Sequence, residues 1–460
     1  MSNPKIGLLP LYVALYDETS PKRRVWLEGF YQQICMELRF RGIDVVEADT
    51  CRIKPEFEKA VADFEAADVD AIVTLHLAYS PSLESSDVLK NTRFPIIVLD
   101  TTPHYEFDYT ISSDKVGANH GIHGVQDMCN LLIRNGKDFQ IFAGHWDNST
   151  VLDDVASAAK GAKMAKSMKN AKVGHLGGPF VGMGDFAIPA DELEKTIGMQ
   201  VKPFVDGELP AVSEEEMEAE YKADCERFAM NSVTYAQYKG SCRTALGIRK
   251  WIEKYGLTAF TMNFMGVDGS TQFDHMPFAE ACKAMGRGIG YAGEGDCLTA
   301  AFVGSLLSVY DETTFAEMFC PNWRDNTIYL SHMGEYNVKC AGSKPDCRIS
   351  NFPYGKNAGK PVNMMTVFKP GKAVYVALNP IGGGKYRLIL TDVEVLEAPY
   401  ETSFRNDVSG WMKVCKPLTE FLPEFSRLGG IHHGAMVYGG DISALASFGK
   451  IMGWEVSVIK

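Results

Sequence analysis

The sequence predicts an α/β fold class with two Rossmann-like parallel-sheet domains followed by a C-terminal antiparallel, β-barrel-like domain. Over about the first 165 residues, short apolar runs alternate with longer amphipathic stretches, and a second segment of this kind follows. The last part of the chain carries period-two runs broken by Gly, Pro and Asn. At roughly 150 residues per domain, a chain of 460 residues holds about three domains. We therefore expect domains at residues 1–167, 168–318 and 319–460.

The first domain is predicted to contain a parallel sheet of five strands. Near-continuous Val, Ile and Leu content is typical of strands that are covered on both faces. We expect these strands at Lys5–Leu9, Asp44–Ala48, Ala71–Leu75, Ile96–Leu99 and Gln140–Ala143. Helical periodicity is found between them, at Arg23–Arg41, Lys54–Ala67 and Val116–Arg134. Polar residues such as Tyr12 and His76 follow the strands, where ligands of open α/β sheets bind.

The second domain is expected to open with AKVGHLGGPFVGMGDF, a strand that leads into a glycine-rich loop. Two helices follow, at Ser213–Met230 and Val233–Tyr255, and then a buried strand, AFTMNF. The domain is completed by FAEACKAMGRG, the turn IGYAGEGD and the apolar helix CLTAAFVGSLLSVY. In the third domain, period-two patterns predict antiparallel strands joined by tight turns in NMMTVFKPG, AVYVALNPIGGG and KYRLILTDVEVLEA.

The net charge and the cysteine pattern indicate which kinds of ligand and which cell compartment to expect. The chain has 46 basic and 58 acidic residues, a net charge of −12, which disfavours nucleic acid or an anionic membrane and favours a small ligand or a metal ion. No run approaches the roughly 18 apolar residues of a membrane span, and the start MSNPKIGLLPLYVALYDE has no basic n-region. The 11 cysteines include no CxxC pair, so we expect a reduced, cytoplasmic protein. We interpret the spacing of Cys340 and Cys347 as chance rather than as a zinc site.

A glycine pattern in the second domain, Gly288, Gly290 and Gly293, matches GxGxxG. The dinucleotide fingerprint requires a strand before the glycines, whereas we expect a helix there, so we discount dinucleotide binding. The same turn delivers Glu294 and Asp296 to the start of the next helix, where carboxylates cap free N–H groups and interact well with the helix dipole. Capping and a functional role both remain open for these two acids.

Acids and histidines downstream favour the functional role. Glu317 lies in FAEMF, His332 in LSHMGE, and His432 and His433 in GGIHHG, where glycines allow close approach of the backbone. Two carboxylates and two imidazoles form a mixed oxygen and nitrogen donor set that suits Mn²⁺ or Co²⁺, with Zn²⁺ and Fe²⁺ as alternatives. Spacing alone does not show that these side chains converge.

Several segments together resemble the L-arabinose isomerase family, which is related to L-fucose isomerases. In chain order they are GYAGEGDCLTAA, FAEMF, LSHMGE, KYRLILTDVEV and GGIHHG. FTMNFMG resembles the strand that carries a substrate-facing Phe in that family, and NHGIHGVQDM resembles its His-Gly segment. The resemblance spans nearly the whole chain. This chain is shorter than typical members, LLPLYVALYDE differs from their Gly-Ser-Gln-type loop, and Cys297 replaces an aromatic residue, so the identity of the sugar stays open.

The resemblance implies roles for named residues. It assigns a divalent metal to Glu294, Glu317, His332 and His433, and makes Glu294 and Glu317 the catalytic pair. The implied metal is Mn²⁺, with Co²⁺, Mg²⁺ or Zn²⁺ as alternatives. The implied substrate contacts are His432, Phe264, His123, His120, Met183, Asp185, Tyr12 and Asp296, with Tyr16 as a further candidate. The family's oligomers imply a homo-oligomer, a trimer or hexamer, in which His123 and His120 reach the site of a neighbouring subunit.

The function so implied is metal-dependent aldose-ketose isomerisation of a sugar through a cis-enediol(ate), which needs a base, an acid and stabilisation of charge on the adjacent oxygens. One alternative is a non-catalytic sugar-binding protein, because two α/β domains with a cleft resemble periplasmic sugar-binding proteins. Another is an epimerase or other sugar enzyme on the same scaffold, including one for 6-substituted hexoses. No arginine-rich anion pocket is evident, and Arg23, Arg24 and Arg405 leave a phosphorylated or sulfonated sugar open. The acids and imidazoles favour the isomerase.

Overall fold

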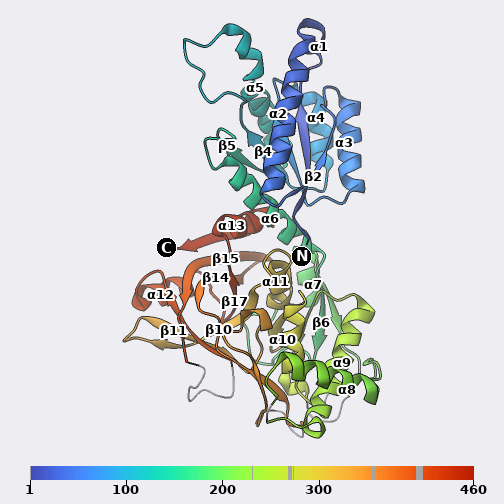
Figure 1. Cartoon of the computed structure of the whole chain (residues 1–460), viewed down its shortest axis with the longest axis vertical. Helices are drawn as coiled ribbons and strands as arrows, with labels where there is room; N and C mark the ends of the chain where they lie inside the picture. Colours follow the sequence, from blue (N-terminus) through green and yellow to red (C-terminus); the bar gives the residue numbers. More distant parts are fainter. Residues whose placement is uncertain (1, 231, 268–271, 273, 355–357, 400–407) are drawn as a thin grey trace. The chain divides into compact units, whose positions relative to one another are not determined.

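The computed structural model describes residues 2–230, 232–267, 272, 274–354, 358–399 and 408–460 (Figure 1). The chain forms two compact units, Met1–Lys166 and Ser167–Lys460, which we describe one at a time. In the part of the chain so described, none of the helices is both long and apolar enough to cross a membrane.

The N-terminal unit is a parallel sheet with strand order β2-β1-β3-β4-β5. The strands are β1 (Lys5–Leu11), β2 (Asp44–Glu47), β3 (Ala71–His76), β4 (Ile96–Asp100) and β5 (Phe139–Ala143). The helices are α1 (Leu15–Thr19), α2 (Pro21–Phe40), α3 (Lys54–Ala66), α4 (Ser82–Asn91), α5 (Ile122–Arg134) and most of α6 (Val151–Lys169), whose last three residues belong to the second unit. All five predicted strands are present, because apolar side chains such as Leu9, Val98 and Phe64 form a continuous core on the sheet.

One predicted helix of this unit is wrong in its extent. Instead of a single helix over Val116–Arg134, a 3-10 helix, η1, spans Ser113–Ala118 and α5 begins at Ile122. The break lies at a close approach, since a Cβ on Gly121 would be 2.8 Å from the carbonyl oxygen of His76. Tertiary packing against the end of β3 thus interrupts a segment whose apolar spacing is helical throughout.

The second unit begins with a four-stranded parallel sheet of order β7-β6-β8-β9. Its strands are β6 (Lys172–Leu176), β7 (Gln200–Pro203), β8 (Ala259–Met262) and β9 (Gly290–Gly293). Its helices are α7 (Ala190–Ile197), α8 (Glu214–Arg227), α9 (Tyr235–Tyr255), α10 (Phe278–Gly286) and α11 (Cys297–Leu307), with a 3-10 turn, η2, at Phe264–Gly266. As expected, a helix, α10, precedes the glycines of the GxGxxG pattern.

Strand β9 corrects our prediction of a turn at IGYAGEGD. The first four residues after Ile289 form a buried edge strand beside β8, and only the last three residues turn into α11. A Cβ on Gly290 would lie 2.2 Å from the carbonyl oxygen of Ala300, so α11 packs directly on the backbone of this strand. Glycine here serves close packing between a helix and a strand, and not the formation of a turn.

The rest of the second unit is a closed antiparallel barrel of six strands with the order β14-β17-β10-β11-β16-β15, in which β15 pairs back with β14 (Figure 1). Its strands are β10 (Thr313–Asn322), β11 (Thr327–His332), β14 (Gly371–Gly382), β15 (Lys385–Val395), β16 (Val408–Val414) and β17 (His433–Tyr438). The remaining elements are η3 (Val338–Cys340), β12 (Asp346–Ile349), β13 (Val362–Met365), α12 (Leu418–Arg427), α13 (Ile442–Ile451) and β18 (Glu455–Ile459). Leu330, Tyr375 and Met412 belong to its core. The predicted fold class is confirmed.

Candidate metal and acid-base site

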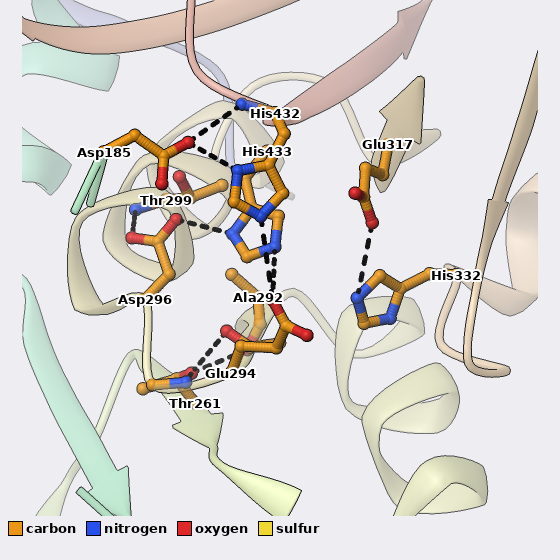
Figure 2. A network of polar contacts seen from close by, with 12 residues as sticks. Asp185, Thr261, Ala292, Glu294, Asp296, Thr299, Glu317, His332, His432 and His433 are labelled. Carbon is orange, nitrogen blue, oxygen red and sulfur yellow. Dashed lines mark hydrogen bonds and ion pairs between the residues drawn. The ribbon is translucent and has the colours of Figure 1, made fainter. Parts of the chain in front are cut away.

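The four residues predicted as metal ligands lie together in the second unit (Figure 2). Glu294 directly follows β9, and Glu317 lies on β10. The register of the barrel then places the histidines: Glu317 is the partner of His433 across β10 and β17, and His332 ends β11, which pairs with the other edge of β10. The end of one parallel strand and three barrel strands therefore form the site.

Glu294 has an unusual backbone conformation. Its φ is 63°, in the left-handed region that residues other than glycine seldom adopt. Its N–H donates to the carbonyl of Met262 at 3.0 Å, and its own carbonyl accepts from the N–H of Phe180 at 3.1 Å. The preceding residue, Gly293, leaves space for an imidazole, because a Cβ there would lie 2.6 Å from Cε1 of His332. Strained residues held in this way cluster at functional sites.

Carboxylate oxygens and imidazole nitrogens face one another across the site. Nε2 of His433 lies 3.5 Å from Oε2 of Glu294, and Nε2 of His332 lies 3.8 Å from Oε2 of Glu317. One ligand atom each of Glu317, His332 and His433 fall within 4.8 Å of one another, and so do those of Glu294, His432 and His433. His433 belongs to both groups and is fully buried, which favours it over His432 as the ligand.

His332 and His433 both contact a carboxylate through Nδ1, which leaves Nε2 of each ring facing the site. Nδ1 of His332 is 2.6 Å from a carboxylate oxygen of Glu335, and Nδ1 of His433 is 2.9 Å from Oδ2 of Asp296. Among the described residues, Nε2 of His433 has no hydrogen-bond partner, although the side chain is 0% exposed. Buried polar atoms rarely lack a partner. An imidazole nitrogen in this state beside two carboxylates fits a divalent cation such as Mn²⁺.

The environment separates the pKa values of the two central carboxyls. Burial would raise the pKa of Glu294, but the nearby imidazoles of His432 and His433 and the charge of His332 hold it well below its usual range. For Glu317, burial outweighs the attraction of the histidines and raises the pKa. The pKa of His332 rises to about 9, because the Glu335 carboxylate more than offsets the effect of burial. Carboxyls whose pKa values are driven apart in one site are typical of acid-base pairs.

Asp185 and Asp296, both expected to contact substrate, contact the paired histidines. Asp185, in the loop after β6, lies 2.5 Å from Nδ1 of His432 and accepts the backbone N–H of the same residue at 3.2 Å. Asp296 is fully buried, caps α11 by accepting the N–H of Thr299 at 2.9 Å, and lies behind His433. Of the two roles left open for Glu294 and Asp296, capping of the helix is observed for Asp296, which also contacts His433.

Phe264 lies in an aromatic group that sequence reasoning missed. Its ring centroid is 5.4 Å from that of Phe180, 5.9 Å from Phe352 and 5.8 Å from Tyr354. Phe180 also bonds through its backbone to Glu294, so the group adjoins the site. Met183 is half-buried in the same glycine-rich loop as Phe180. Spacing gave no signal for this group, because its members come from three separate segments.

The remaining candidates form a group within the N-terminal unit. Nε2 of His120 lies 2.6 Å from Nδ1 of His123, and the hydroxyl of Tyr16 is 3.5 Å from the other nitrogen of His120. The ring of Tyr12, which is fully buried, packs at 5.9 Å against Tyr16. Of the arginines considered for an anionic sugar, Arg23 stacks over Tyr16 and Arg24 pairs with Asp17, while Arg405 lies outside the described residues.

Glu335 is a further site residue that the sequence analysis did not single out. Its side chain is completely buried and bridges His332 and the hydroxyl of Tyr291, which lies 2.9 Å from its second carboxylate oxygen. The His-x-x-Glu spacing in LSHMGE was the available signal, because a turn brings such residues together. A buried glutamate is otherwise indistinguishable in sequence from a solvated one.

Comparisons with known proteins agree with this architecture. Residues 192–311 match the L-arabinose isomerase central domain, and residues 312–455 match the L-arabinose isomerase C-terminal domain. These two matches cover most of the second unit, which carries the acid-histidine site. They place the protein in the class of aldose-ketose sugar isomerases. The chain belongs to the L-arabinose isomerase family, which confirms the resemblance seen in its motifs.

Similar proteins span nearly the whole chain. The L-arabinose isomerase of Shouchella clausii is 26% identical over 469 residues, covering 98% of this chain and 93% of that protein. The L-arabinose isomerase of Oceanobacillus iheyensis is 27% identical and covers 85% of each chain. Among solved structures, the periplasmic binding protein component of the arabinose ABC transporter from Shewanella sp. ANA-3 matches at 17% identity over 66% of this chain and 85% of its own, with a TM-score of only 0.17.

Proposed function

We propose that this protein is a divalent-cation-dependent aldose-ketose isomerase that uses Glu294 and Glu317 as its acid-base pair. The observation that carries the proposal is geometric. The two carboxylates lie on either side of two imidazole Nε2 atoms, in one buried cluster. A sugar bound there would have carboxyl groups close to both carbons between which the proton moves.

The chain's own residues would do most of the work. One carboxylate takes a proton from C2 of the aldose and returns it to C1, while the other exchanges protons with the adjacent oxygens. A positioned side chain of this kind contributes roughly 10²–10⁴-fold to the rate. His432, held by Asp185 and 31% exposed at its side chain, is placed to donate to a sugar hydroxyl.

Glu294, Glu317, His332 and His433 would hold the cation. When bound, a divalent ion supplies stabilisation of negative charge on the carbonyl and hydroxyl oxygens of the sugar. The donor set favours Mn²⁺, and Co²⁺, Mg²⁺ and Zn²⁺ are the ions to compare with it. We also propose that the protein works as a homo-oligomer. We predict a trimer or a hexamer, and light scattering would measure which of the two forms.

The test is exchange of solvent protons into a sugar. The protein, supplied with each of the four ions in turn, is incubated in D₂O with a panel of pentoses, hexoses and 6-substituted hexoses that includes L-arabinose. Nuclear magnetic resonance should then show deuterium at C1 or C2 together with formation of a ketose. Absence of exchange across the whole panel would favour a sugar-binding protein instead, and exchange with inversion at a carbon would indicate an epimerase.

Variants identify the groups responsible. Glu294→Gln and Glu317→Gln remove one carboxylate each with little change in shape, and each should lower the exchange rate by roughly 10²–10⁴-fold. Glu397→Gln makes the same change at an exposed position and should leave the rate unchanged. Near-normal turnover in either site variant with cation still bound would rule out the proposed pair.

A further inference from the structure

We infer that Glu335, held by Tyr291, is a positioning residue that sets the tautomer and the orientation of His332 for cation binding. This inference rests on the proposed cation site. It concerns two residues that lie behind the site and do not face the substrate. Both are fully buried, and neither belongs to the four donors.

The hydrogen bonds around Glu335 define one arrangement of the imidazole. One carboxylate oxygen lies 2.6 Å from Nδ1 of His332, so that nitrogen carries the proton and donates it. Nε2 is left facing Oε2 of Glu317 at 3.8 Å, and a bound cation would take the place of any proton on this nitrogen. In metal sites the second nitrogen of a histidine ligand is commonly held by a carboxylate in this way.

Tyr291 fixes the carboxylate in turn. Its hydroxyl donates to the other oxygen of Glu335 at 2.9 Å, so both oxygens have a partner and the side chain has little freedom to rotate. Tyr291 lies on β9, the strand that ends one residue before Glu294, whereas His332 ends β11 and Glu335 lies in the turn that follows. The chain of contacts therefore couples the position of Glu294 to the orientation of His332.

The same device occurs on the opposite side of the site, where Asp296 faces Nδ1 of His433. Two carboxylates from different elements thus hold two imidazoles in the same tautomer, with both Nε2 atoms directed at the cluster. This repetition is difficult to explain by core packing alone, because an apolar residue would fill either position without the cost of burying a charge. Because Asp296 also caps α11, its substitution would affect the helix as well, so Glu335 is the better position to test.

The test measures cation binding without any sugar. Mn²⁺ affinity, followed by electron paramagnetic resonance, should fall roughly 10- to 100-fold in Glu335→Ala. Glu335→Gln, which keeps an acceptor but loses the charge, should recover part of that loss. Tyr291→Phe keeps the carboxylate and should weaken binding by roughly 2- to 10-fold. Glu312→Gln changes an acid that directly precedes β10 and pairs with Lys369, and this variant should bind as the wild type does.

A spectroscopic signature separates positioning from general loss of stability. Co²⁺ bound to the wild type has a visible d–d spectrum that reports its donors, and this spectrum should change in Glu335→Gln while circular dichroism stays the same. If Glu335→Ala does not fold, Glu335→Gln and Tyr291→Phe decide the question. Wild-type affinity and an unchanged Co²⁺ spectrum in these variants would overturn the inference and leave the proposed site intact. A wild-type protein that binds none of the ions would overturn both.

Discussion

Two buried clusters of charge in the second unit differ in how their charges are balanced. The first links α8, α9 and α10: Lys283 lies 2.6 Å from Glu220 and 2.8 Å from Asp224, and Arg249 lies 2.7 Å from both Glu220 and Glu280. Arg287 also pairs with Glu280. Three basic and three acidic side chains therefore neutralise one another within the protein.

The second cluster is the candidate site, whose central acids, Glu294 and Glu317, lie beside histidines and, among the described residues, not beside lysine or arginine. In the described parts of the chain, the ion pairs of Glu294 and Glu317 are made with His332, His432 and His433. Burying carboxylates without compensating charge is costly. This difference is what the proposed cation site predicts, because a cation would add the fixed positive charge that lysine and arginine supply to the first cluster.

The largest expected effect on stability concerns the cluster that links α8, α9 and α10. Lys283→Met removes the ion-pair partner of the buried Asp224 and leaves Glu220 paired with Arg249 alone, and should lower the free energy of unfolding by about 3–5 kcal/mol, measured in urea. Adding Asp224→Asn to this variant should restore part of the loss, because it removes the unpaired charge. A loss below about 1 kcal/mol would show that this cluster behaves like an exposed pair.

The next largest effect on stability concerns the candidate site. Mn²⁺ at about 100 times its dissociation constant should raise the free energy of unfolding by about 2.7 kcal/mol, because it binds the folded chain only. Chelation should remove this increment. Lys283→Met should show the same increment as the wild type, whereas Glu317→Gln should show less. An increment that vanishes in Lys283→Met but persists in Glu317→Gln would reverse the roles assigned to the two clusters.

Lowering the pH should reduce the contribution of Glu220, in the cluster that links α8, α9 and α10, to the free energy of unfolding. Burial would raise the pKa of Glu220, but the hydrogen bond from Arg249 and the charge of Lys283 lower it to about 2, against an ordinary value of 4.5. A lowered pKa contributes stability above the ordinary value, and this contribution is lost as the pH falls from 4.5 to 2. The difference in unfolding free energy between wild type and Glu220→Gln should therefore shrink over this range in urea titrations. A constant difference would contradict the assignment.

The smallest effect serves as the reference for an exposed pair. Lys59 and Asp63 are 2.8 Å apart on α3, with side chains 72% and 59% exposed. Because water screens such a pair, Lys59→Met should change the free energy of unfolding far less than Lys283→Met does. A change as large as that of Lys283→Met would mean that burial does not explain the difference between the pairs.

Much of the fold could be predicted from local pattern. The five strands of the N-terminal unit and the two long helices α8 and α9 follow apolar periodicity, which burial enforces directly. The predictions that were wrong lie where packing overrides pattern. Gly121 interrupts a helical segment because the carbonyl of His76 lies against it, and Gly290 lies in a strand because α11 needs to approach its backbone.

The sequence by itself determined the class of the fold, the family and the kinds of group available for chemistry, since these depend on residue types and their order. Only the tertiary structure decided which groups meet. Glu317 and His433 face each other because of the register between β10 and β17, and Glu294 joins them because β9 ends beside that pair. Glu335 became visible as a functional candidate only once its burial against His332 was known. Side chains more than 100 residues apart converge through pairing and packing, which spacing along the chain does not encode.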